Sequence, residues 1–576
     1  MMLCRARGWL VVLALTVAAP AVAEGPAPAP PSPFRFSVLS EQWQTQLARD
    51  PALDVPSAIT RDHEVQRVTL KETIAIALEN NPGIAARRLE PTRVQQDVLE
   101  AQGQYDPVAA ADLLYSKVVT PNPNALSGVN TSDISTTSGN VYLRKLLRTG
   151  ARLDVDFLNE RLDNNAQFIE LRPQYTPQLG LSLVQPLLRD FGWDFSYLVV
   201  RVAERTADAA YYQYEADLTD FVVQVIIAYW AVVGRREAVE VRREAMVLAE
   251  RTVSENQARV DVGLLPPVSV LEAQADAKSR EEQLLVAQND LTIARQRLAQ
   301  LAFFRPQGSF VPRSLEPVED ADREDVQPEV DDSLALALVD RPEIAASAKG
   351  VEVRQLNERI TGNQLLPRVD LVGGYGLNGL SGRTESFISE RNLGGCTFIS
   401  QDVWQCPNSR FGGPKSEAYH RLYSGDFESY NFGIQVEVPI DNATARARNT
   451  RSKIELNQAE LNHRQLLSDV TLEVRQTVSD VLTSRQRIDT SRVARELADQ
   501  NLRNQEKRHE VGMATTKDLL DFQTRLTEAR AAEVQSQIDH AISLARWRRA
   551  EGQLLDHFQI VIDRPGVTAT PWFAWF

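Results

Sequence analysis

Two long stretches of the chain carry a helical pattern of apolar residues. Between Phe195 and Val262 there is no proline, and one apolar stripe keeps helical spacing: Leu218, Phe221, Val222, Val225, Tyr229, Val232 and Val233. From Ala443 to Val511 there is neither proline nor glycine, and apolar residues stay close to heptad spacing: Leu467, Val470, Val474, Val478, Val481 and Ile488. At ~1.5 Å per residue, each stretch predicts a rod of roughly 100 Å. Rods of this length are typical of a bundle or a hollow helical tube rather than a compact core.

Other segments alternate apolar and polar residues with a period of two, which predicts strands with one apolar and one polar face. They are segments 153–157, 179–183, 369–377 and 432–440. A soluble sheet packed on a core has this pattern, and so does a lipid-facing barrel with a wet lumen. The strands alone leave both alternatives open. The polar segment 380–428 between the strands of the second half is predicted to be a long loop.

Both long helices run into the same short sequence, Val-Gly followed by an apolar residue. Gly263 and Gly512 supply the left-handed backbone that closes a helix, so each marks the tip of a helical hairpin. Pro266 and Pro267 after the first tip suit a helix start, and Thr515 and Thr516 are N-cap candidates after the second. Return helices of roughly half the length are predicted at 268–303 and 517–555. Two tips in register indicate an internal duplication.

The segment before the strands is duplicated as well. Thr69 and Glu72 form a predicted capping box, Asn81-Pro82 interrupts the helix, and Pro342 stands in the second copy where Pro82 stands in the first. The sequence therefore divides into a signal peptide 1–23, a lead segment 24–66, a first repeat 67–304 with strands about 106–188 and a tip at 263, a linker 305–329, a second repeat 330–556 with strands about 367–440 and a tip at 512, and a tail 557–576.

The N-terminus predicts export. Arg5 and Arg7 precede an apolar run, and Ala21-Val22-Ala23 is a small-x-small cleavage site. The alternative, an uncleaved anchor helix, is disfavoured because the run is short for a membrane span. After cleavage two cysteines remain, Cys396 and Cys406. A local disulfide is the favoured interpretation in an exported protein, and two free thiols are the alternative.

Charge and residue distribution exclude several functions. The formal net charge of the 576-residue chain is −14, which argues against a nucleic-acid partner. The six histidines are scattered without metal-ligand spacing. We therefore expect no enzyme activity, no cofactor and no metal site. No stretch beyond the leader has the 18 unbroken apolar residues of a membrane helix, so membrane entry by this exported chain requires a closed β-barrel.

The order of these pieces, duplicated, resembles the outer-membrane efflux proteins, the TolC-like channels of tripartite pumps and type I secretion systems. The resemblance covers about Val68 to Leu555 and rests on Asn81-Pro82, the strand-to-helix passage from Leu181 to Gly192, and both Val-Gly tips. It implies a mainly α fold with a β-barrel part: duplicated long-helix hairpins forming a trimeric α-barrel, topped by a shared transmembrane β-barrel. It also implies a homotrimer in the outer membrane of a Gram-negative bacterium, in contact with outer-membrane lipid and extending into the periplasm.

The resemblance further implies a passive exit duct, opened at its periplasmic tip by an adaptor (membrane fusion) protein and an inner-membrane pump. Acidic residues just after the second tip form the periplasmic constriction in the family, and here Asp518 and Asp521 occupy those positions. Without the resemblance, both are helix N-terminal acids favoured by the helix dipole. The adaptor-docking tips would be Val262, Gly263, Leu264, Val511, Gly512 and Met513.

Two departures from the family pattern stand out. The tyrosine and arginine that latch the closed tip in the type member are replaced by His509 and Ala514, and we interpret His509 as a solvated tip residue rather than a pH switch. The first repeat also has an additional extended pair, 140–147 and 151–159, that either enlarges the barrel beyond four strands per subunit or folds as a loop. The competing hypothesis for the whole chain is an exported periplasmic coiled-coil scaffold or surface protein without a channel.

Overall fold

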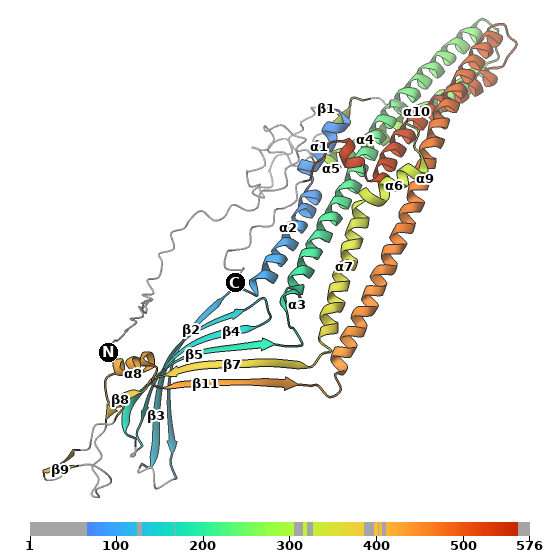
Figure 1. Ribbon diagram of the computed structural model, residues 1–576. Helices are drawn as coiled ribbons and strands as arrows, with labels where there is room; N and C mark the ends of the chain where they lie inside the picture. Colours follow the sequence, from blue (N-terminus) through green and yellow to red (C-terminus); the bar gives the residue numbers. More distant parts are fainter. Residues whose placement is uncertain are drawn as a thin grey trace, which may run out of the picture.

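A computed structural model gives the structure, and it describes residues 66–123, 129–166, 169–303, 315–319, 326–384, 397–400, 403–405 and 410–562. A long helical body continues at one end into a single large β-sheet (Figure 1). The predicted leader, the tail beyond residue 562, and Cys396 and Cys406 lie outside the described residues.

Each repeat begins with two helices of matching length. In the first repeat, α1 (Leu70–Asn80) has 11 residues and α2 (Pro82–Gly103) has 22. In the second, α6 (Val330–Asp340) and α7 (Pro342–Asn363) have the same 11 and 22 residues. Proline is the first residue of both α2 and α7. Its missing N–H costs nothing there, because the N–H groups of the first turn have no acceptor within the helix. The predicted capping box at the start of α1 is present.

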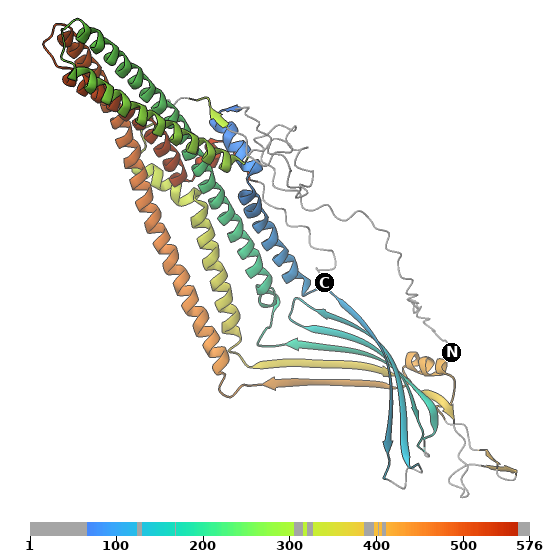
Figure 2. The ribbon, with the colours of Figure 1, turned by 180° about the vertical axis from the view of Figure 1, so that it is seen from behind.

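The long helices match the predicted rods to within a few residues. α4 (Leu198–Asp261) has 64 residues and returns through α5 (Val268–Ala302), while α9 (Ala443–Glu510) has 68 and returns through α10 (Thr516–Glu551). Short α3 (Trp193–Ser196) leads into α4, and α11 (Leu554–His557) follows α10. Towards the sheet, α2, α4, α7 and α9 lie side by side in that order, and both views show it (Figure 2).

The predicted stripe of α4 is the main hydrophobic core. All seven of its residues are buried, and they pack against α1, α5, α10 and α11. Two short parallel strands, β1 (Gln66–Val68) and β6 (Leu315–Pro317), pair across the edge of this core and join the segment before α1 to the segment between the repeats. In α9, Val470, Val474 and Val478 form a second core with Ala337 and Ala550.

Helix α4 also contains a window of mean hydropathy 1.6 that is long enough to cross a membrane. Two thirds of that window (67%) is buried inside the protein. A buried core helix passes the same test of length and composition. We therefore interpret this window as the part of α4 that packs in the hydrophobic core of the helical body.

Six long antiparallel strands form the sheet in the order β11-β7-β5-β4-β3-β2. They are β2 (Val108–Pro121), β3 (Thr131–Leu146), β4 (Arg152–Asn164), β5 (Leu171–Pro186), β7 (Arg368–Asn378) and β11 (Glu428–Glu437). The additional extended pair of the first repeat is thus not a loop. It is the hairpin β3–β4, and it lies inside the sheet between β2 and β5.

Segment 380–428 is not wholly a loop, contrary to the sequence prediction. It contains β8 (Ser381–Thr384), which pairs with β5, the two-stranded pair β9 (Thr397–Ser400) and β10 (Val403–Gln405), and helix α8 (Lys415–Ser424). Ala418 and Leu422 of α8 are buried one helical turn apart, and the Tyr419 hydroxyl donates a 2.7 Å hydrogen bond to Asn159 Oδ1 of β4. Contacts of α8 with the sheet thus stabilise a helix that the polar composition of segment 380–428 did not predict.

Candidate functional site at the hairpin tips

The end of the helical body farthest from the sheet is built by the two hairpin tips (Figure 1). At the first tip, Gly263 has φ +77°, its amide donates to Val260 O at 2.9 Å, and the Leu264 amide donates to Arg259 O at 2.8 Å. This pair of bonds satisfies carbonyls that the last helical turn leaves open. The positive φ explains the glycine.

The second tip repeats this geometry. Gly512 has φ +74°, its amide donates to His509 O at 3.1 Å, and the Met513 amide donates to Arg508 O at 2.8 Å. At both tips the residue after the glycine is apolar and exposed, with Leu264 74% and Met513 73% accessible. Val262 and Val511 before the glycines are exposed as well. The end of the molecule thus presents two similar apolar knobs to solvent.

Asp518 caps the helix after the second tip. Its Oδ2 accepts hydrogen bonds from the Thr515 amide at 3.0 Å and the Thr515 hydroxyl at 2.7 Å, and its own amide donates to Thr515 Oγ1 at 3.2 Å. These hydrogen bonds to the side chain and backbone of Thr515 lower the pKa of Asp518. Thr515, rather than Thr516, is the N-cap of α10. Asp518 is therefore ionised and fixed in direction by the cap.

Asp521 lies one turn further along α10 and is exposed, like Asp518. The two carboxylates are on the same end of the helix, where the dipole favours negative charge. Within one chain Asp518 caps its own helix, and both carboxylates face solvent at the tip end of α10.

Near the tips, buried polar side chains tie the two hairpins to each other. Asn256 of α4 is 1% exposed, and its Nδ2 donates to Ser269 O of α5 at 3.2 Å and to Thr516 Oγ1 of α10 at 3.3 Å. One amide thus bridges the first hairpin and the start of the last return helix. Buried polar groups of this kind are costly to leave without partners, so they specify one arrangement of the hairpins.

The same link is repeated further from the tip. Gln523 Nε2 of α10 donates to Thr252 Oγ1 of α4 at 3.2 Å, and its buried Oε1 has no hydrogen-bond partner among the described residues. Buried Arg280 of α5 pairs with Asp276 at 2.6 Å and donates to Thr524 Oγ1 at 3.1 Å. We call the polar contacts that cross between the hairpins, Asn256–Thr516, Gln523–Thr252 and Arg280–Thr524, the hairpin link.

His509 is buried, and its interpretation as a solvated tip residue is wrong. It is 6% exposed, its Nδ1 lies 3.0 Å from Ala514 O, and its carbonyl accepts a hydrogen bond from Arg259 Nη1 at 3.4 Å. The contact between the buried imidazole and Ala514 O spans the turn of the second tip and stabilises it. The positions that carry the latch in the type member of the family thus contact each other within one turn.

The hairpin link was not anticipated from the sequence, although a signal for it exists. In α10 the buried stripe runs through Leu519, Leu520, Leu526 and then Thr527, and Gln523 occupies its middle position. In α4, Thr252 and Asn256 continue a buried stripe of alanines. A polar residue at an otherwise apolar stripe position predicts a buried polar contact between helices.

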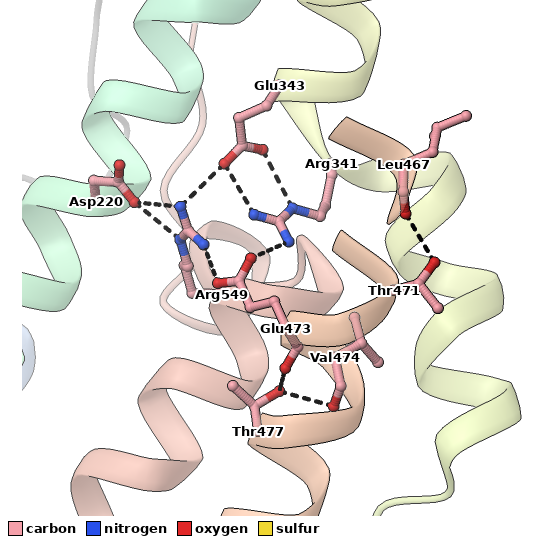
Figure 3. A network of polar contacts seen from close by, with 9 residues as sticks. All are labelled: Asp220, Arg341, Glu343, Leu467, Thr471, Glu473, Val474, Thr477 and Arg549. Carbon is pink, nitrogen blue, oxygen red and sulfur yellow. Dashed lines mark hydrogen bonds and ion pairs between the residues drawn. The ribbon is translucent and has the colours of Figure 1, made fainter. Parts of the chain in front are cut away.

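A second polar cluster joins the repeats at mid-height (Figure 3). Arg341 between α6 and α7 is 3% exposed and binds Glu343 at 3.2 Å and Glu473 of α9 at 2.7 Å. Arg549 of α10 binds the same two carboxylates and also Asp220 of α4, at 2.9 Å. Burial raises the pKa of Glu343, but the hydrogen bond and charge of Arg341 and the charge of Arg549 outweigh it, so the net shift is downward. The cluster is charged and holds four helices together.

We searched the described residues for metal-binding clusters and for paired nucleophile and base side chains. Among them, no group of three or more His, Cys, Asp or Glu side chains is arranged to hold a metal ion. Ser484 Oγ and His540 Nδ1 lie 3.0 Å apart, but both are buried between α9 and α10 together with Ser543. A nucleophile must reach its substrate, so this pair belongs to helix packing.

Comparison with known proteins agrees with this architecture. The family model for outer membrane efflux proteins matches residues 172–302 and 334–553, which is more than half of the chain. No curated protein matches the sequence. Among solved structures, the fold is similar to the outer membrane channel CmeC of Campylobacter jejuni (16% identity, 84% of this chain and 86% of that chain, TM-score 0.58).

Two further channels are similar to the same extent. The outer membrane protein VceC of Vibrio cholerae is 18% identical over 84% of this chain and 96% of its own, with a TM-score of 0.58. The open state of the MtrE outer membrane channel of Neisseria gonorrhoeae is 17% identical over 88% and 97%, with a TM-score of 0.55. The predicted fold class, mainly α with a β-barrel part, is confirmed, and the chain belongs to the outer membrane efflux protein family.

Proposed function

We propose that three copies of this chain form the outer-membrane exit duct of a tripartite efflux or type I secretion system. The single observation that carries the proposal is the arrangement of one chain: a sheet with open edges at one end, hairpin tips at the other, and uninterrupted helices between them. A helix of 64 residues is roughly 95 Å long, so the tips lie far from any bilayer that holds the sheet.

The open sheet edges favour a channel over an exported coiled-coil scaffold. β2 and β11 expose most of their residues, including large apolar ones such as Leu113, Tyr430 and Phe432. An exposed apolar edge strand is an aggregation hazard in water. Closure of the sheet by further copies in a membrane removes both the free edges and the exposed apolar surface.

The tips are the proposed docking site for the periplasmic adaptor and the pump. Leu264 and Met513, with Val262, Val511 and the two glycines between them, form two neighbouring apolar knobs on a charged helical body. Such a surface suits a partner that buries both knobs together. No reaction is needed for this role, and we propose a passive conduit rather than an enzyme, without a cofactor, because the energy comes from the pump.

The proposed gate consists of Asp518 and Asp521 around the three-fold axis of the tips. Three copies of each side chain would form two acidic rings, which favour cations and oppose anions at the narrowest point. The cap on Asp518 supports this proposal, because it fixes the direction of that carboxylate. We further propose that the hairpin link holds the two tips of each subunit together and breaks when the duct opens.

The test is single-channel conductance of the purified protein in a planar bilayer. We expect a small, cation-selective conductance for the wild type and a larger or less selective one for Asp518→Ala with Asp521→Ala. Because Asp518 also caps α10, Asp521→Ala alone separates the ring from the cap. A folded trimer without conductance would reject the channel, whereas insertion with unchanged mutant selectivity would reject only the acidic gate.

A further inference from the structure

The hairpin β3–β4 changes the size of the pore. We infer that each copy of this chain contributes six strands to the barrel wall, so that three copies close an eighteen-stranded barrel. The inference rests on the proposed trimer and goes beyond it, because four strands per subunit, the number in the family pattern, close only twelve.

Strand order is the first argument. β2 pairs with β3 along its whole length, from Val108 opposite Arg144 to Pro121 opposite Thr131. β4 pairs in turn with β5, from Arg152 opposite Val184. Removal of β3 and β4 from the wall would therefore leave β2 without its partner, and the hairpin is not an appendage at the rim.

Strand length is the second argument. β3 has 16 residues and β4 has 13, compared with 11 for β7 and 10 for β11. A tilted strand needs about 9–11 residues to cross a bilayer. The inserted strands β3 and β4 are thus longer than β7 and β11, the two long strands of the second repeat, and long enough to cross a bilayer.

The two faces of the inserted strands agree with those of the rest of the sheet. Opposite pairs place Val141 beside Phe157 and Phe157 beside Leu179 on one face. On the other face, Arg144 is opposite Asp154, and Asp154 is opposite Ser182. On one face, Val141 and Leu143 of β3 and Leu153, Val155 and Phe157 of β4 form an apolar belt suited to lipid, and the opposite face of this part is polar, as the wall of a wet lumen would be.

The edges of the six-stranded sheet fit a second copy of the same chain. β2 leaves the helical body and β11 returns to it, so these two edge strands run in opposite directions. Both are exposed on both faces. When β2 of one copy meets β11 of the next, the antiparallel pattern continues across the junction, and no edge remains.

The dimensions of sheet and helices also agree. Four helices per copy, α2, α4, α7 and α9, descend to the sheet, so a trimer has twelve, and at 8–10 Å apart they form a tube roughly 95–120 Å in circumference. Eighteen strands at 4.7–4.9 Å spacing and a tilt near 40° give about 110 Å, whereas twelve give about 75 Å. Six strands per copy let the barrel continue the helical tube without a marked narrowing.

A barrel of this size has the width of porins that hold an aqueous channel. The outer-membrane part would then be wide enough for hydrated solutes, and the tips would be the narrower point of the duct.

The experiment has two parts. The first is a cryo-electron microscopy structure of the wild-type assembly in detergent, in which the strands around the ring are counted at the level of the apolar belt. The second compares Val155→Arg with Leu158→Arg, both in β4. Val155 lies opposite Leu181 on the apolar face, whereas Leu158 lies opposite Gln178 on the polar face.

Eighteen strands, together with a loss of at least tenfold of membrane-inserted protein for Val155→Arg and less than twofold for Leu158→Arg, support the inference. A trimer with twelve strands and residues 131–164 outside the wall overturns it and leaves the exit duct intact. Equal tolerance of both arginines also overturns it, because β4 would then not face lipid. An eighteen-stranded trimer without conductance rejects the proposed function instead.

Discussion

Asn256 and Thr516, 260 positions apart, meet through a buried hydrogen bond of 3.3 Å between Nδ2 and Oγ1. The bond crosses from the first hairpin to the second near the tips, so any opening that separates the hairpins breaks it. A buried hydrogen bond contributes about 1 kcal/mol, which is about a fivefold change in an equilibrium.

Replacement of Asn256 is therefore predicted to loosen the closed tip. Asn256→Ala should raise the open probability in planar-bilayer recordings by about fivefold per subunit. Gln257→Ala is the matched control, since Gln257 is exposed and its side chain donates to Asp261 Oδ1 within its own helix. An unchanged open probability for Asn256→Ala, with the fold intact by circular dichroism, would contradict a latching role.

The apolar knobs of the tips predict a separable docking defect. Leu264→Asp with Met513→Asp should abolish cross-linking to the adaptor in cells, because charged side chains replace the buried centre of the interface. Both residues are exposed in the isolated chain, so assembly and conductance of the purified channel should stay within about twofold of wild type. Exposed Val247→Asp, on the shaft of α4, controls for added charge. Adaptor cross-linking at the wild-type level in the double variant would place the docking surface elsewhere.

The charged cluster at mid-height predicts a stability effect that depends on burial. Arg341→Met should destabilise the helical body by about 3 kcal/mol, because it leaves Glu343 and Glu473 short of a buried cation. Arg451→Met removes an exposed pair with Glu455 and should cost less than about 0.5 kcal/mol. Thermal unfolding of the helical signal by circular dichroism separates the two. Equal melting temperatures would show that the cluster contributes nothing net.

Glu79 at the end of α1 predicts a pH dependence. Burial raises its pKa to about 7, so the folded protein binds a proton that the unfolded chain releases at lower pH. This contribution to stability is complete below the ordinary pKa of 4.5 and is lost as the pH rises through 7. Partial exposure reduces the effect to about 1–2 kcal/mol.

Glu79→Gln should accordingly be more stable than wild type at pH 8 and equal to it near pH 4.5, measured as thermal midpoints across that range. Exposed Glu100→Gln in α2 should leave the difference between the two pH values as in wild type. A constant gap between Glu79→Gln and wild type at every pH would mean that the carboxyl does not titrate in this window.

The helices were predictable because their determinants are local. Prolines, glycines and threonines punctuate the chain at the ends of α1, α4 and α9, and the apolar stripes between them have one clear period. Strand β3 was the harder case. Its segment contains Ser135, Thr136, Thr137, Ser138 and Gly139, polar on both faces, and only pairing with β2 and β4 shows that it is part of the sheet.

The polar contacts of the candidate site were only partly predictable. Asn256 and Gln523 stand within stripes of buried residues, which signals their burial, but their hydrogen-bond partners depend on which helix lies opposite, and the sequence of one helix does not specify its neighbour. The burial of His509 likewise depends on the fold of the tip around it. The same holds for α8. Its two buried residues, Ala418 and Leu422, are too few to predict an amphipathic helix, and their burial depends on contact with the sheet.

The pairing of β1 with β6 has a consequence for chain connectivity. It fastens the start of the first repeat to the segment that joins the repeats, while Arg341 and Arg549 bind α4 of the first repeat to three helices of the second. The halves are thus held together by contacts that do not require a continuous backbone. A gene cut between residues 303 and 315 places β1 and β6 in different polypeptides. With an export leader added to the second, the two halves should find each other and complement in trans, which makes this chain a candidate for a split reporter of assembly in the envelope.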